Sequence, residues 1–135
     1  LWILYLGYLG MGLGLFAAAF YAMGWTVHLS WPVHSIAVAG FGALILGMMT
    51  RTALGHTGRN LSADSYMICS FVFITVAIIL RVMALSLNTA SMIWLHASAA
   101  CWTLAFVIYL VKFFPILTRA RADKKPGKPV RLHSS

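Results

Sequence analysis

Residues 65–87 read SYMICSFVFITVAIILRVMALSL, a run in which Arg81 is the only charged residue. At about 1.5 Å per residue, a helix of this length crosses the roughly 30 Å of hydrocarbon in a bilayer. Three other runs of the chain are also apolar and long enough to span a bilayer. We therefore expect an all-α polytopic transmembrane bundle of four spans, at about residues 1–24, 33–50, 65–87 and 91–114.

The composition supports this fold class. Hydrophobic residues make up 61% of the chain and charged residues 9%, whereas soluble domains are about 45–50% apolar and about 25% charged. A chain of 135 residues cannot hide that much apolar surface from water in one small core. A bilayer removes the need to hide it.

The basic residues predict the orientation of the spans. Six of the ten Lys and Arg residues follow the last apolar run: Arg119, Arg121, Lys124, Lys125, Lys128 and Arg131. The loop 51–64 carries two more, Arg51 and Arg59, while the connectors 25–32 and 88–90 carry no charge. Because basic loops stay in the cytoplasm, we expect both ends of the chain on the cytoplasmic side of the membrane.

The formal net charge of +8 raises the question of nucleic acid. Its concentration directly after a hydrophobic span favours retention by membrane lipids over nucleic-acid binding. We expect a bundle at 1–117 and a basic cytoplasmic tail at 118–135. The chain opens inside an apolar run without a visible signal peptide, so we expect it to be the C-terminal part of a longer protein.

Local signals predict where helices begin, end and approach each other. Ser62 or Asp64 can cap the third helix, and Pro115 marks the end of the fourth. Gly10 and Gly14, four residues apart in the first run, form a small face on which a second backbone can approach closely.

Ionisable residues inside spans are costly and are therefore functional candidates. His34 lies in the first turn of the second span, Arg81 less than two turns from the end of the third, and His96 just over one turn into the fourth. By helix rise, all three fall within roughly the outer 10 Å of the bilayer, near His28 of the connector. Lys112 lies close to the cytoplasmic surface and can extend to it.

This layer has the residue types that a cofactor needs. Neutral imidazole binds haem iron and copper, so His34 and His96 on facing helices could hold a haem b, with His28 as a further metal ligand. Arg81 would pair with a propionate. The alternative is that each histidine hydrogen-bonds to a neighbour and holds no cofactor.

A second polar segment, residues 49–61, is basic and punctuated by glycines. Arg51, His56 and Arg59 could anchor an anion such as a haem propionate or a lipid phosphate. The alternative is a simple turn whose charges retain the loop in the cytoplasm.

The same segment, Arg51-x-x-Leu54-Gly55-His56-Thr57-Gly58-Arg59, resembles the motif of the NnrS family of bacterial inner-membrane proteins. The resemblance covers nearly everything from His34 onward. It includes these further positions: Gly40, Gly47, Met49-Thr50, Arg81-Val82, Trp102-x-x-Ala105-Phe106, Pro115-Ile116-Leu117, Arg121-x-Asp123 and Pro126-Gly127. Lys124-Lys125 stand where family members usually have a glycine, a departure confined to the tail.

The resemblance implies roughly the last third of a protein of about a dozen spans, whose remaining helices would pack against these. It also implies haem and copper, and protection under nitrosative stress with nitric oxide as a ligand. Arg51, His56, Arg59 and His34 carry over as site residues.

Two other functions remain open: a redox or electron-transfer subunit with b-type haem, and a transporter or structural subunit without a cofactor. No catalytic residue is assigned.

Overall fold

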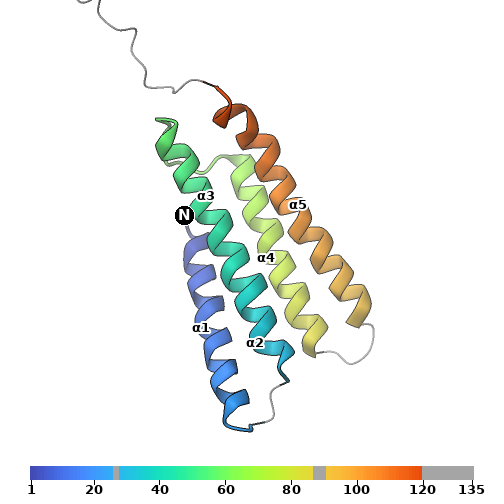
Figure 1. Cartoon of the computed structure of the whole chain (residues 1–135). Coiled ribbons are helices and arrows are strands. Elements are labelled where there is room, and N and C mark those ends of the chain that lie inside the picture. The colour runs from blue at the N-terminus through green and yellow to red at the C-terminus, as the bar shows by residue number, and fades with distance from the viewer. Residues whose placement is uncertain (26–27, 87–90, 120–135) are drawn as a thin grey trace, which may run out of the picture.

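The computed structural model describes residues 1–25, 28–86 and 91–119, and it is built of long helices (Figure 1). The elements are α1 (Ile3–Ala22), α2 (Ser30–His34), the π-helix η1 (Ser35–Gly42), α3 (Ala43–His56), α4 (Ser65–Ser86) and α5 (Ser91–Leu117). The described residues include no strand. Because α2, η1 and α3 are continuous, the part of the chain that the structure describes forms four helices long and apolar enough to cross a membrane, which confirms the predicted all-α bundle of four spans.

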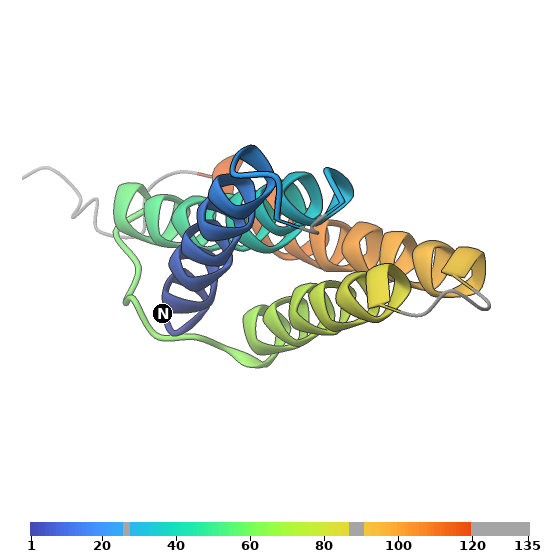
Figure 2. The same cartoon turned by 90° about the horizontal axis from the view of Figure 1, so that it is seen from below.

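The helices associate mainly as two pairs. One pair is α1 with the span formed by α2, η1 and α3, and the other is α4 with α5 (Figures 1 and 2). The two pairs meet at a core that includes Leu46, Phe71, Ile74 and Phe113. Large side chains on the outside of the bundle, such as Phe16, are exposed, as expected of helices that face lipid.

The second span is longer than predicted. We expected a connector from Arg51, but α3 continues to His56. Its apolar face continues too, because Ala53 and Leu54 are buried. The helix ends at Thr57, and Gly58 then adopts a positive φ of 68°, which glycine tolerates best.

The first pair is packed through glycine, as predicted for Gly10 and Gly14. A Cβ added at Gly10 would lie 2.6 Å from the Ala39 Cβ and 2.8 Å from its carbonyl carbon. One added at Gly14 would lie 2.5 Å from Ile36 Cγ1. Both contacts are with η1, so the widened turns of the π-helix lie directly against α1.

The second pair is joined by serine hydroxyls. Ser70 Oγ of α4 donates to the carbonyl oxygen of Ala105 on α5, and Ser98 Oγ of α5 donates to that of Ala77 on α4, each over 2.7 Å. The two bonds run in opposite directions and lie about two turns apart. Both serines are buried.

The ends of α4 and α5 partly follow the predictions. Asp64 Oδ1 accepts a hydrogen bond from the Met67 N–H over 3.0 Å, so Asp64 is the cap of α4. The fourth span does not end at Pro115, because α5 runs on to Leu117. Pro115 lies inside the last turn of α5, where its missing N–H removes one intrahelical hydrogen bond. From residue 120 onward the predicted tail lies outside the described residues.

Candidate functional site

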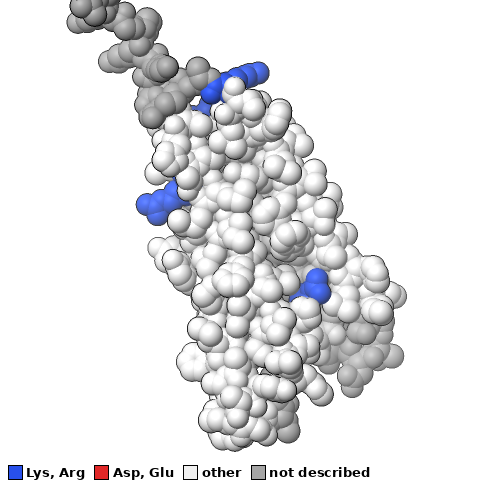
Figure 3. All heavy atoms as spheres, viewed as in Figure 1, with Lys and Arg blue, Asp and Glu red and all other residues white. Residues whose placement is uncertain are grey.

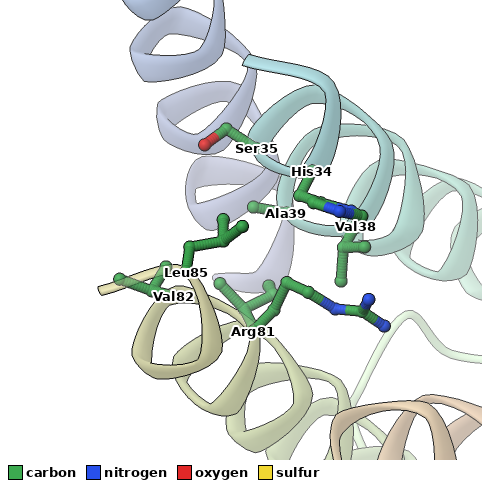
Figure 4. A pocket seen from close by; sticks show the side chains of 8 residues that line it. His34, Ser35, Val38, Ala39, Arg81, Val82 and Leu85 are labelled. Carbon is green, nitrogen blue, oxygen red and sulfur yellow. The ribbon is translucent and has the colours of Figure 1, made fainter. Parts of the chain in front are cut away.

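His34 and Arg81 line one pocket. His34 is the last residue of α2 and Arg81 lies on α4, and Figure 4 shows both side chains extending toward the same side. The other lining residues are Ser35, Val38, Ala39, Ile78, Val82 and Leu85. The cavity has a volume of about 20 Å³, which is room for a water molecule. Among the predicted outer-layer residues, the fold therefore brings these two together.

Arg81 is held by α5. Its Nε donates to Ser98 Oγ over 3.2 Å, and the Ser98 hydroxyl donates in turn to the Ala77 carbonyl. A guanidinium in a membrane span thus has a defined polar partner on a neighbouring helix. Ser98 could not be predicted as a site residue, because a serine in an apolar helix carries no signal of which residue it faces.

The ring nitrogens of His34 are accessible. In the described part of the chain no hydrogen bond involves its imidazole, and no fully buried side-chain nitrogen or oxygen lacks a partner. The ring nitrogens of this partly buried side chain are therefore not fully enclosed by the packed interior. An accessible imidazole is available to bind a ligand.

A wider groove adjoins this pocket. Its lining comprises Ala37, Val38, Arg81, Ala99, Trp102 and Thr103, and its volume is about 300 Å³. Val38 and Arg81 line both hollows, so the guanidinium lies between the confined pocket and the open groove. The groove combines an aromatic and mainly apolar surface with one permanent positive charge.

His96 and His28 lie elsewhere. His96 is exposed, and its Nδ1 donates to the Met92 carbonyl oxygen over 2.7 Å, which leaves Nε2 free of that bond. It lines neither hollow described above. His28 is exposed in the connector. Within residues 1–25, 28–86 and 91–119, no group of three or more His, Cys, Asp or Glu residues could hold a metal ion, and the assignments to a cofactor stay predictions.

The three predicted site residues of the segment 49–61, which are Arg51, His56 and Arg59, lie in different surroundings. Arg51 is exposed on α3. His56, at the end of α3, lines a hollow of about 360 Å³ with Met48, Met49 and Tyr109 among its walls. Arg59 lines a different cleft, described below.

Lys112 is not simply extended toward the surface. Its ammonium forms an ion pair with Asp64 and lies 5.3 Å from the centre of the Tyr66 ring. Burial raises the pKa of Asp64, but hydrogen bonds from Lys112 and from the Met67 N–H, together with the charge of Lys112, bring that pKa below its ordinary value. The signal available in the sequence was that Asp64 is the one acidic residue ahead of the tail.

The comparisons with known proteins give one match. The family model described as NnrS protein matches residues 1–121. Neither the curated proteins nor the solved structures contain a match.

Proposed function

This chain belongs to the NnrS family, and we propose that it is a haem-binding membrane protein of the bacterial response to nitric oxide. The observation that carries the proposal is the accessible His34 imidazole beside Arg81 inside a membrane span. Imidazole is a common axial ligand of haem iron. A guanidinium pairs with a carboxylate such as a propionate.

The fit of a haem to these residues depends on which hollow is considered. The confined cavity of about 20 Å³ cannot contain a macrocycle. The groove beside it offers Trp102 and apolar side chains around the Arg81 charge. His34 lines the adjoining cavity and not the groove itself. From there it would supply a ring nitrogen to the iron, and Arg81, which lines both, would hold a propionate. When bound, a haem with an exchangeable position supplies the site at which nitric oxide binds.

His96 is not a haem ligand in this proposal, although its depth in the fourth span is similar to that of His34 in the second. Its ring lines neither hollow at His34, so the described residues give no support to a sandwich between the two histidines. With His28 it stays a candidate for a separate metal contact.

Copper is proposed for the hollow at the end of α3. His56 contributes an imidazole, and Met48 and Met49 contribute thioethers to its lining. Soft thioether and imidazole ligands suit copper(I). Metal analysis of the purified protein should find copper, and Met48→Leu with Met49→Leu should lower its content while Cys69→Ala does not.

The visible spectrum of the intact protein in detergent tests the haem proposal. We expect a Soret band that shifts when nitric oxide is added to the reduced protein. His34→Ala should remove most of the haem, and Arg81→Gln should lower its retention. Cys69→Ala, a change at an exposed residue of α4, should leave the band intact.

Two results would favour the other functions. A Soret band that does not respond to nitric oxide would contradict the proposed ligand and favour an electron-transfer subunit. A protein that folds but has no Soret band would favour a transporter or a structural subunit.

A further inference from the structure

A second charged hollow lies at the opposite end of the bundle from His34. Its lining residues come from the segment after α3, the beginning of α4 and the end of α5, and these segments lie at the same end of the bundle (Figure 1). The cleft has a volume of about 350 Å³ and is lined by Arg59, Tyr66, Val111, Lys112, Pro115, Ile116 and Arg119. Figure 3 shows basic atoms at this end of the bundle, and further basic groups lower on the same, otherwise uncharged face.

The cleft has an excess of positive charge. The ammonium of Lys112 is paired with Asp64. Arg59 and Arg119 form no ion pair in the part of the chain that the structure describes. Two guanidinium groups are therefore available, and both follow the C-terminal end of a helix, where the partial negative charge of the helix favours a cation.

The remainder of the lining is apolar and continues along the span. Val111 is 65% exposed and lies on the same helix as Pro115 and Ile116, facing the region where lipid chains would lie. Two arginines beside an apolar wall at the end of a membrane bundle match a molecule with an anionic phosphate and a hydrocarbon tail. Arginine binds phosphate through two parallel hydrogen bonds, and basic pockets between spanning helices bind anionic lipid headgroups.

We propose that this cleft binds the phosphoryl group of an anionic phospholipid through Arg59 and Arg119, with an acyl chain along Val111. Because the charge of Lys112 is neutralised by Asp64, the phosphate would bind to the two arginines and not to Lys112. Arg59 comes from the loop and Arg119 from the end of α5, so a bound lipid would link these two segments. The proposal does not depend on haem binding.

The test measures lipid retention by native mass spectrometry of the intact protein, with phosphatidylglycerol, phosphatidylcholine and inorganic phosphate added in separate titrations. We expect phosphatidylglycerol to be retained at least tenfold more tightly than phosphatidylcholine. Two arginines near a membrane surface correspond to roughly 30-fold in affinity. Arg59→Gln with Arg119→Gln should therefore lose roughly that factor.

A matched control separates the cleft from general surface charge. Arg119→Gln and Arg51→Gln each remove one exposed arginine. The sequence pattern grouped Arg51 with Arg59 as an anchor for an anion, but in the structure Arg51 does not line the cleft. Only Arg119→Gln should weaken phosphatidylglycerol retention, and both proteins should elute as single species in gel filtration.

Four results would overturn the proposal. The first three are equal retention of both lipids, an unchanged affinity in the double variant, and equal losses in the Arg119 and Arg51 variants. Displacement of the lipid by inorganic phosphate at a similar concentration would also overturn it, because the ligand would then be a soluble anion. The Soret band of the double variant reports on the haem proposal separately.

Discussion

The two helix pairs of this bundle are held together in different ways. In the pair of α1 with η1, glycines allow close backbone contact, and no side-chain hydrogen bond joins α1 to another element among the described residues. In the pair of α4 with α5, buried serines bond to backbone carbonyls and Lys112 pairs with Asp64. Because lipid tails are as apolar as the side chains, the hydrophobic effect contributes little to the association of helices in a membrane. Close packing and interhelical hydrogen bonds stabilise the pairs instead.

This difference has a consequence for mutation. The contact of α1 with η1 depends on the close approach of two backbones. Its stability should therefore fall strongly when a larger side chain is introduced and change little with pH. The contact of α4 with α5 depends on polar groups, so its stability should fall when a hydroxyl or a charge is lost. The predictions below test this contrast in order of decreasing effect.

The largest effect on stability is expected at Gly10, where α1 packs against η1. Gly10→Val places a side chain against the Ala39 Cβ and backbone, which cannot move as a flexible side chain could. We expect a loss of about 3 kcal/mol in the free energy of unfolding, measured by denaturant titration in detergent. Gly12→Val is the matched control, because no atom lies within 4 Å of a Cβ there. Equal losses in the two variants would contradict the close-contact account.

An intermediate effect on stability is expected at Ser98, whose hydroxyl joins α5 to α4. Ser98→Ala removes the hydroxyl that bonds to Ala77 and accepts from Arg81. Hydrogen bonds between membrane helices contribute about 0.6 kcal/mol on average and up to about 1.7 kcal/mol. We therefore expect about 1 kcal/mol, because one change breaks two contacts.

The control for Ser98 is Thr75→Val. The Thr75 hydroxyl bonds within its own helix, to the Phe71 carbonyl, so its loss should leave the α4–α5 contact intact. A larger loss of stability in the Thr75 variant than in the Ser98 variant would show that the interhelical bonds do not stabilise the pair.

The smallest effect is expected from pH. The pKa of Asp64 is lower in the folded protein than its ordinary value of 3.8. Its contribution to stability is therefore complete above that ordinary value and is lost as pH falls through the lower, folded-state pKa. Because the pair is partly exposed, the contribution should be below about 1 kcal/mol.

Unfolding titrations at neutral and at acidic pH measure this term. Asp64→Asn should reduce the difference between the two pH values, whereas Gly10→Val should retain it. If the Asp64 variant keeps the full pH dependence, the ion pair does not stabilise the α4–α5 pair.

The candidate site shows which predictions a sequence can support. His34, Arg81 and His96 were placed in one layer because depth follows from counting residues along each span. Depth does not give the direction in which a residue faces around the helix axis. The fold directs His34 and Arg81 into one pocket and turns His96 to an exposed position.

Short stretches of sequence were enough to predict the four spans and the glycine contact of α1, and to limit the cap of α4 to Ser62 or Asp64. Each of these depends on residues close together in the chain, through hydropathy, helical spacing or a local hydrogen bond. The structure was needed to assign the cap to Asp64 and the end of α3 to His56. It was also needed for the contacts of Ser98 with Arg81 and of Lys112 with Asp64, which join residues far apart in the chain. The partners in such contacts are fixed only when the helices pack in one rotation and register.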